Sequence, residues 1–455
     1  MTTTRPMLSR RALLGSVPAL AALPACAPER PAGGSGLTMR PHGDDGPAMR
    51  PSGDDGPAMR PAGHDAGPGE PALFDNPFAS WIDLASRAGG AEDGPWPRAN
   101  TVALTVRAMH DALNAIEPRY QRWTPRGPSE PSGAGASPLV AASAAAHALL
   151  VTRGSRAEPD ALLAACVARE PSGAAREAGI ALGAAVGATT LARAGATPPE
   201  RRRYADSDRE AVWRPTPVRH ANTYFYLDPP FLFPDRGALF GPPPPHLSSV
   251  LYREMLEEVR RIGGKVSTER TAAQAEAASF WVPQLLRRNL MIVLLLRLTA
   301  QPPRGGPWDM ARMVSILATA NADADVFAYG AKAHYSFWRP VTAINLGSPG
   351  IAADPGWQPL LETPAHPDHP SGHSVDISTG TFVIAGLLGD GPVRYQAYDR
   401  PDRPARNFPS LTAVRRECSD SRVWAGAHFR TACTAGEEIG EAIARRALAQ
   451  VPPTA

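Results

Sequence analysis

Apolar residues recur at helical spacing along most of the chain, whereas the alternating pattern of strands is scarce. The segment after Ser249 is the clearest case, because Leu251, Met255, Val259 and Ile262 share one helical face and the serine is a typical N-cap. The same spacing predicts helices over 101–116, 138–152, 159–169, 173–194, 270–300, 307–335, 373–388 and 427–449. The sequence therefore predicts an all-α fold, built as a large helical bundle.

A Pro-rich connection from Trp213 to Pro245 divides the predicted helices into two groups. A chain of 455 residues is long enough for one large core or for two fused halves. We therefore expect an N-terminal helical half over 71–245 and a C-terminal helical half over 246–450.

The first 70 residues differ in composition from the rest. Ser9-Arg10-Arg11 precedes a short apolar run that ends at Cys26, which is typical of a twin-arginine export signal over 1–27. The residues before Cys26 are similar to a lipoprotein signal and also fit a cleavage site. Residues 28–70 contain a ten-residue repeat rich in Pro and Gly, which predicts a disordered linker. We expect the mature protein to be periplasmic, secreted or lipid-anchored at Cys26.

Charge and hydropathy argue against two kinds of partner. The formal net charge of +3 is too small to predict binding to nucleic acid. Beyond the signal, no run reaches the roughly 20 apolar residues that span a bilayer, and the best one, Met291 to Leu296, stops at Arg297. We therefore expect no transmembrane segment. The oligomeric state, a homo-oligomer included, stays open.

Two of the four cysteines bracket the last polar motif of the chain, Cys418 before it and Cys433 after it. Because export leads to an oxidising compartment, this pair is the candidate disulfide. Two buried thiols are the alternative.

Three polar segments of the C-terminal half carry the candidate chemistry. In the first, Lys332 and Arg339 are seven residues apart, so both cations would lie on one face of a helix that Pro340 ends. Taken alone, this segment also fits a basic, solvated helix face.

The second segment runs from His366 to His373. Its prolines predict an extended loop, and Ser371-Gly372 stands where the next helix should begin. Free backbone N–H groups and the helix dipole bind oxyanions at such a start, the Ser371 hydroxyl is a further donor, and Gly372 lets an anion approach the backbone. His373 is able to titrate near neutral pH. A capping turn with incidental histidines is the alternative.

The third segment contains Arg422, Gly426 and His428. A separation of six would put Arg422 and His428 on different faces of one helix. We therefore expect Arg422 before a helix, Gly426 at a bend and His428 in the first turn. Arg422 would donate two hydrogen bonds to an oxyanion, and His428 would ligate a metal or attack phosphorus. A core histidine beside a surface arginine is the alternative.

Together, Lys-x6-Arg-Pro, Pro-Ser-Gly-His and Ser-Arg-x3-Gly-x-His closely resemble the three-motif signature of the vanadium-dependent haloperoxidase and type 2 phosphatidic-acid-phosphatase superfamily. The resemblance extends to Trp96–Trp123, which includes His110-Asp111, to Val212-Trp213 and to 267–281. It therefore covers about 75 to 450.

This resemblance implies a role for each motif residue. The oxygens of vanadate or phosphate would be held by Lys332, Arg339, Ser371, Gly372 and Arg422. His428 would be the axial ligand of vanadium in a haloperoxidase or the nucleophile in a phosphatase, and His373 would be the acid–base. In a haloperoxidase, vanadate is the cofactor and Lys332 polarises the oxidant. Hydrogen peroxide and a halide are then the substrates, and a small organic acceptor takes the hypohalous acid.

Three further positions refine this comparison. His366 matches a histidine that bromoperoxidase-like members place at the vanadate site, which favours bromide or iodide, with a loop histidine as the alternative. Asp323 matches an acidic position of bacterial relatives and is expected behind the oxyanion site, with an exposed aspartate as the alternative. Ala432 stands where the family usually has an acidic residue that orients the axial histidine. A backbone carbonyl is the expected replacement there.

Three functions remain open at this point. The first is a vanadium-dependent haloperoxidase, the second a soluble acid phosphatase acting through phospho-His428, and the third a non-catalytic, oxyanion-binding envelope protein. The fold alone cannot separate them.

Overall fold

The structure is a computed structural model that describes residues 77–88, 96–194, 201–205, 207–215, 224–226, 228–282, 306–395 and 406–454. All of these residues belong to one of the two units of the chain, Gly63–Ala455. The predicted export signal over 1–27, Cys26 and the predicted linker over 28–70 lie outside the described residues. So does the 283–300 part of the helix predicted over 270–300.

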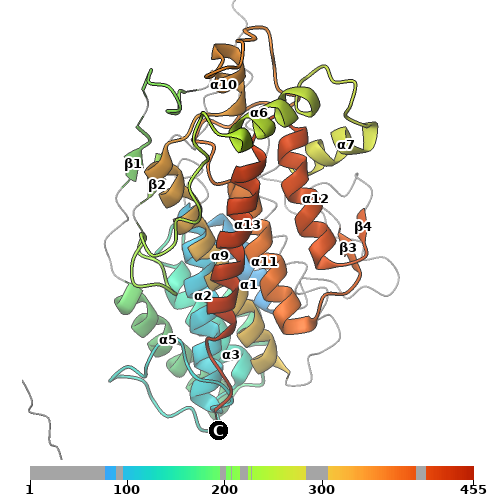
Figure 1. Cartoon of the computed structure of the whole chain (residues 1–455). Coiled ribbons are helices and arrows are strands. Elements are labelled where there is room, and N and C mark those ends of the chain that lie inside the picture. The colour runs from blue at the N-terminus through green and yellow to red at the C-terminus, as the bar shows by residue number, and fades with distance from the viewer. Residues whose placement is uncertain are drawn as a thin grey trace, which may run out of the picture. The chain divides into compact units, whose positions relative to one another are not determined.

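Helices dominate the described residues (Figure 1), which confirms the all-α prediction. The first group comprises α1 (Pro77–Arg87), α2 (Trp96–Ile116), α3 (Pro138–Leu150), α4 (Ala157–Ala168) and α5 (Ala174–Ala194). The second comprises α6 (Val250–Ile262), α7 (Ala272–Phe280), α9 (Pro307–Tyr335), α10 (Pro340–Leu346), α11 (Gly372–Leu388), α12 (Leu411–Trp424) and α13 (Arg430–Leu448).

Short strands form two antiparallel pairs between the helices. β1 (Arg201–Arg203) pairs with β2 (Tyr224–Tyr226), with Arg202 opposite Phe225. β3 (Val393–Tyr395) pairs with β4 (Arg406–Phe408), with Arg394 opposite Asn407. Both pairs are three residues long, so they join helices without forming a layer of their own.

Side-chain caps begin several of the helices where the sequence predicts a start. The Ser249 hydroxyl accepts the Tyr252 N–H at the start of α6, as its position before the apolar stripe predicts. At α7, the Thr271 and Gln274 side chains each accept the other's backbone N–H, which is a capping box. These local signals therefore fix helix boundaries in the C-terminal half.

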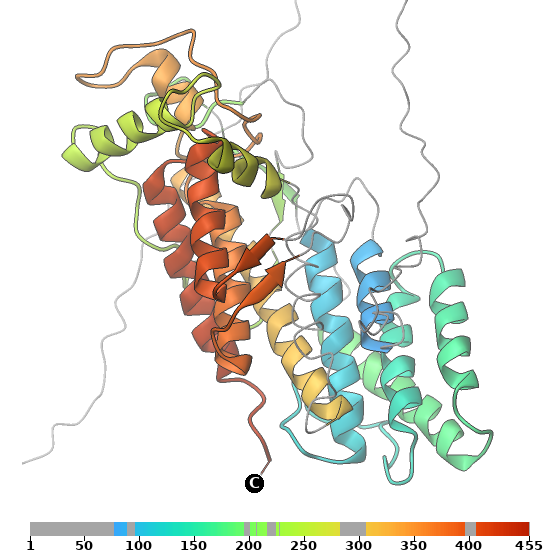
Figure 2. The same ribbon diagram turned by 90° about the vertical axis from the view of Figure 1, so that its right-hand side faces the viewer.

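Helix α9 is the central element of the fold. Nearly every side chain from Trp308 to Lys332 is buried, because small and apolar residues surround the helix on all sides. It packs against α2 on one side and against α11 and α13 on the other (Figure 2). The largest core cluster accordingly contains residues of α1, α2, α3, α9, α11, α12 and α13. Helices of both predicted halves thus share one core, and the boundary at 245/246 stays a prediction.

Glycines bring α13 unusually close to α11. A Cβ at Gly436 would lie 2.8 Å from the Ser371 carbonyl oxygen, and one at Gly440 would lie 2.6 Å from the Ser378 Cβ. Only glycine allows this approach without a shift of the helices. The start of α11 is therefore pressed against the first turns of α13.

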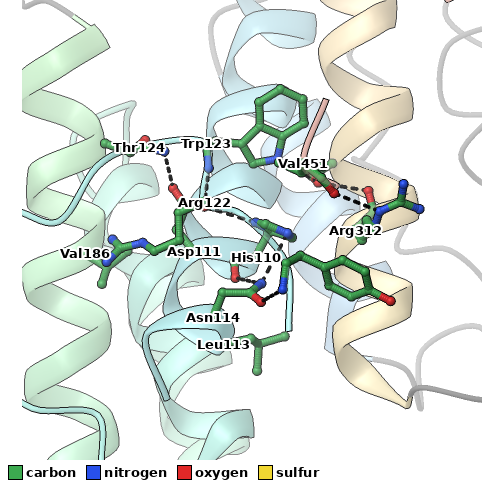
Figure 3. A network of polar contacts seen from close by, with 12 residues as sticks. His110, Asp111, Leu113, Asn114, Arg122, Trp123, Thr124, Val186, Arg312 and Val451 are labelled. Carbon is green, nitrogen blue, oxygen red and sulfur yellow. Dashed lines mark hydrogen bonds and ion pairs between the residues drawn. The ribbon is translucent and has the colours of Figure 1, made fainter. Parts of the chain in front are cut away.

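A network of hydrogen bonds connects the loop after α2 to α2 itself and to α9 (Figure 3). The Asp111 carboxylate accepts the backbone N–H groups of Trp123 and Thr124, each at 2.8 Å, and lies 3.0 Å from His110 Nδ1. The Trp123 indole N–H then donates to the Ser315 hydroxyl of α9 at 2.9 Å. The His110-Asp111 run therefore links α2, this loop and α9.

In the part of the chain that the structure describes, none of the helices combines the length and the apolar character that a membrane span requires.

Candidate active site

Lys332 and Arg339 do not share a helical face, so that prediction is wrong. Helix α9 ends at Tyr335, because Ser336 takes a left-handed conformation with φ 43°. Arg339 is an extended residue that directly precedes α10, and Pro340 is the first residue of that helix instead of the end of α9. Both cationic side chains are nevertheless completely buried.

Lys332 holds the loop that precedes α11. Its ammonium group donates to the carbonyl oxygens of Pro367, Asp368 and Pro370 at 2.8, 2.9 and 2.5 Å. Burial, and then the charge of Arg339, lower the pKa of Lys332 well below its usual range. The side chain therefore shapes this loop in addition to supplying charge.

Helix α11 begins at Gly372, as predicted, and Ser371 is its N-cap. The Ser371 hydroxyl accepts the Ser374 N–H at 3.3 Å. A Cβ added at Gly372 would meet nothing closer than the Lys332 Cε, at 3.8 Å. Because of this glycine, the backbone at the helix start is open toward the lysine stem.

His373 lies in the first turn of α11 and is almost completely buried. Its Nε2 is 2.9 Å from the carbonyl oxygen of Trp281, the residue after α7. A carbonyl oxygen accepts only, so this contact indicates that Nε2 carries a proton.

The third motif differs from its predicted arrangement in two ways. Arg422 lies in the last turn of α12 rather than before a helix, and His428 lies in the link before α13 rather than in a first helical turn. The bend at Gly426 is confirmed, with φ +71°, and a Cβ there would lie 2.4 Å from the Gly263 carbonyl oxygen. The His428 N–H donates to the Arg422 carbonyl at 3.2 Å, so the link stays short.

Basic side chains surround the buried imidazole of His428. Its Nε2 is 3.0 Å from Arg339 Nη1, and the ring is 1% exposed. Burial lowers the pKa of His428 well below its usual range, and the charges of Arg339, Lys332, Arg422 and His373 lower it further. The imidazole is therefore neutral near pH 7 and presents a lone pair among positive groups.

Arg339 joins the second motif to the third. Its Nε donates to the His366 carbonyl at 2.8 Å, and Nη2 lies 2.9 Å from His366 Nδ1. Its Nη1 donates to the Ala427 carbonyl at 2.6 Å. The His366 ring also packs edge-on against Tyr329. The structure thus brings His366 beside the other motif residues.

Sequence reasoning missed Asp368, which is completely buried in this cluster. Its Oδ1 lies 2.9 Å from His428 Nδ1 and 3.9 Å from Arg339 Nη1. Burial raises its pKa to about 7, against the lowering effect of Arg339 and Lys332. The signal available in the sequence was its place as the one acidic residue between His366 and His373.

Asp323 lies elsewhere. Its carboxylate accepts the backbone N–H groups of Phe231 and Leu232 at 2.6 and 2.9 Å. Nine helical residues separate it from Lys332, which is about 13 Å along the axis of α9. It therefore anchors the segment before α6 and does not support the oxyanion site as predicted.

The predicted disulfide between Cys418 and Cys433 is not formed. Both cysteines are buried, and among the described residues no disulfide joins them. Burial raises the pKa of the Cys433 thiol to about 12. The neighbouring Ala432 is also buried, and its carbonyl oxygen accepts the Ser371 N–H at 2.8 Å. That carbonyl therefore bonds to the α11 start and not to His428.

These residues fit a tetrahedral oxyanion. Three basic side chains, Lys332, Arg339 and Arg422, surround a neutral imidazole, and each is at most 3% exposed. The buried Asp368 carboxylate lies 3.9 Å from Arg339 Nη1. Buried charge is costly unless it is paired, and guanidinium groups with an open helix start are suitable donors for an oxyanion.

The ends of α9 and α12 and the starts of α10, α11 and α13 meet at this site (Figure 1). Residues 312–452, which include all of these ends, match the family model of the VCPO second helical-bundle domain. Comparison with curated proteins finds no match.

Solved structures share the fold over most of the chain. A bacterial vanadium-dependent iodoperoxidase matches with a TM-score of 0.65 and 19% identity, over 84% of this chain and 97% of that one. The holo form of a bacterial vanadium-dependent chloroperoxidase matches with a TM-score of 0.58 and 17% identity, over 82% and 92%. An apo form matches with a TM-score of 0.56 and 17% identity, over 76% and 91%. At these identities, the likeness shows the fold.

The chain thus shares the fold of the bacterial vanadium haloperoxidases, and its C-terminal bundle over 312–452 is also similar in sequence to the VCPO second helical-bundle domain.

Proposed function

We propose that this protein is a vanadium-dependent haloperoxidase. The observation that carries the proposal is the neutral, buried His428 ring with three basic side chains around it. Vanadate would be bound by His428 and held by Lys332, Arg339, Ser371, Gly372 and Arg422. The iodoperoxidase and chloroperoxidase folds support this function.

Bound vanadate supplies Lewis-acid activation of hydrogen peroxide, which makes the oxidation of a halide possible. The protein supplies the rest. Arg339, Arg422 and Lys332 offset the negative charge, and their burial excludes water and strengthens this effect. Because they are already in place, little reorganisation is needed during the reaction.

His373 is the candidate acid–base. Its Nε2 is engaged by the Trp281 carbonyl, so a proton would be taken up and returned at Nδ1. Trp281 in turn donates its indole N–H to Glu417 of α12 at 3.1 Å. These contacts fix the ring, so it does not have to reorient during proton transfer.

The halide is proposed to be bromide or iodide. His366 would stand beside the oxyanion, because its Nδ1 lies 2.9 Å from the same guanidinium that approaches His428. An imidazole there gives the site a polar wall. A small organic molecule would accept the hypohalous acid.

The test is halide oxidation by the purified full chain, with bromide and with iodide, in the presence and absence of orthovanadate. We expect oxidation only when vanadate and hydrogen peroxide are both present, and none in His428→Ala. Hydrolysis of phosphate monoesters without halide oxidation would instead identify a phosphatase. Orthovanadate binding with neither reaction would identify a non-catalytic oxyanion-binding protein.

A further inference from the structure

His428 needs a hydrogen-bond partner on Nδ1 to present Nε2 to an oxyanion. Histidines at such sites usually donate their second ring N–H to a carboxylate or a carbonyl, which fixes the tautomer and the ring orientation. Position 432, one turn into α13, carries alanine, and its carbonyl oxygen bonds to Ser371. Helix α13 therefore supplies neither kind of partner from this position.

The loop before α11 supplies the partner instead. Asp368 Oδ1 lies 2.9 Å from His428 Nδ1, and both side chains are buried. The backbone N–H of Phe429, the next residue, lowers the pKa of the Asp368 carboxyl group. The carboxylate thus lies beside the link that leads into α13.

Two further contacts fix the position of Asp368. Its backbone N–H donates to the Phe337 carbonyl at 2.9 Å, and its own carbonyl accepts from Lys332 at 2.9 Å. Lys332 also binds the carbonyls of Pro367 and Pro370, on either side. The backbone that carries the carboxylate is therefore held at several points before any ligand binds.

We propose that Asp368 is the positioning residue for His428, so that a carboxylate from the loop before α11 replaces the one that α13 lacks. This inference deepens the proposed function and rests on it for the identity of the bound oxyanion. Asp368 acts through His428 and is not itself expected to contact the oxyanion.

The tautomer of His428 follows from this contact. A proton on Nδ1 would face the Asp368 carboxylate at 2.9 Å and leave the lone pair on Nε2, so this is the tautomer that the proposal requires. Arg339 Nη1 stands 3.0 Å from Nε2 and 3.3 Å from Nδ1, so it lies slightly closer to the nitrogen that would bind vanadate.

A simple charge partner for the neighbouring cations is the other role that Asp368 could have. Its Oδ1 is 3.9 Å from Arg339 Nη1, too far for a hydrogen bond. Lys332 binds its backbone carbonyl at 2.9 Å, which would not require an acidic side chain. The shortest side-chain contact is therefore the one to His428.

The first test reads the tautomer in the wild-type chain without any ligand, by nitrogen NMR of protein with 15N-labelled histidine. The signals of His428 are assigned by their loss in His428→Ala, since the chain has 11 histidines. We expect a protonated Nδ1 and an unprotonated Nε2 near pH 7. A proton on Nε2 would overturn the proposal, whatever reaction the protein catalyses.

The second test measures the Kd of orthovanadate, and of inorganic phosphate as a second probe, by calorimetry. We expect Asp368→Ala to weaken both about 10- to 100-fold, as loss of such outer partners does at metal sites. Asp368→Asn keeps the shape and serves if the alanine variant does not fold, and a loss of about tenfold is expected. Wild-type affinity in the folded variant would overturn the proposal.

Asp376→Asn is the matched control. Asp376 lies in α11, and its charge also acts on Lys332. Its removal should leave the His428 nitrogen signals unchanged, whereas Asp368→Asn should shift them. Equal shifts in both variants would mean that only local charge matters. Because neither test measures halide oxidation, failure here is distinct from failure of the proposed function.

Discussion

At the residue scale, Lys332 supplies a positive charge to the site and also holds the loop before α11 in place. Its three hydrogen bonds to carbonyl oxygens hold the loop that carries His366 and Asp368, the partners of Arg339 and His428. Substitution should therefore disturb both folding and ligand binding.

The variant Lys332→Met removes the donor and keeps most of the stem. We expect the free energy of unfolding to fall by roughly 2–3 kcal/mol, because three buried carbonyls lose their partner. Urea unfolding measures this change. The exposed Lys265 is the other lysine of the chain, and Lys265→Met should change stability by less than about 0.5 kcal/mol. Equal effects of the two substitutions would contradict this role.

Asp323 makes a pH-dependent contribution to stability. Burial raises its pKa from 3.8 to about 7, against the lowering effect of two backbone N–H groups and Arg107. A carboxyl group whose pKa rises on folding stabilises the fold fully below the unfolded pKa, near 4. That contribution is lost as pH rises through 7, at about 1.4 kcal/mol per unit of pKa difference.

We therefore expect the stability of the wild-type chain, relative to Asp323→Asn, to be greater at pH 5 than at pH 8. Urea unfolding of both proteins at the two pH values measures this difference. An unchanged difference would show that Asp323 titrates normally in the folded chain.

At the scale of elements, the contact between α11 and α13 sets the geometry of the site. Gly436 faces the Ser371 carbonyl and the Ser374 Cβ, each 2.8 Å from an added Cβ. A larger residue would separate the start of α11 from the link that carries His428.

Gly436→Ala should therefore lower the free energy of unfolding by about 1–3 kcal/mol, as overpacking does. It should also weaken orthovanadate binding. Gly330 of α9 is a matched control, since an added Cβ would meet nothing within 4 Å. Gly330→Ala should be neutral or stabilising, by up to about 1 kcal/mol, because alanine favours helices. Equal destabilisation by both substitutions would show that the close contact at Gly436 is not the cause.

Helix starts could be predicted from the sequence where a side chain caps them, as at Ser249 and Ser371. Two helix ends could not. Residues 336–339 contain neither Gly nor Pro, yet α9 ends at Tyr335, and α12 runs through Arg422 because nothing breaks it before Gly426. The end of α9 therefore has no Gly or Pro signal in the sequence, and the signal for the end of α12 lies four residues beyond Arg422.

The motif residues could be predicted because each kind of group suits an oxyanion, but their partners could not. Asp368 and His428 are 60 positions apart, and only the fold brings them together. The same limit applies to Asp323, whose two backbone N–H donors lie on a segment about 90 positions earlier.

At the scale of the whole molecule, the shared core makes the N-terminal helices a support for the site. The Asp111 network joins α2 to α9, and Lys332 lies near the far end of α9. Stability and ligand binding should nevertheless respond to different residues.

Asp111→Ala should lower the melting temperature by several degrees, because one buried and one half-buried backbone N–H group lose their acceptor. Its Kd for orthovanadate should stay within about twofold of the wild-type value at a temperature where it is folded. His428→Ala should instead weaken orthovanadate binding and change the melting temperature little. Scanning calorimetry and titration calorimetry on both variants check this, and a weakened Kd in Asp111→Ala would contradict the separation.

The central claim is that one oxyanion binds the full chain at His428. Titration with orthovanadate, in wild-type protein and in folded His428→Ala, tests it most directly. We expect one site per chain in the wild type and a loss of at least about 100-fold in the variant, since the ligand that would bind vanadium is gone. Saturable binding of equal strength in both proteins would show that the oxyanion binds elsewhere.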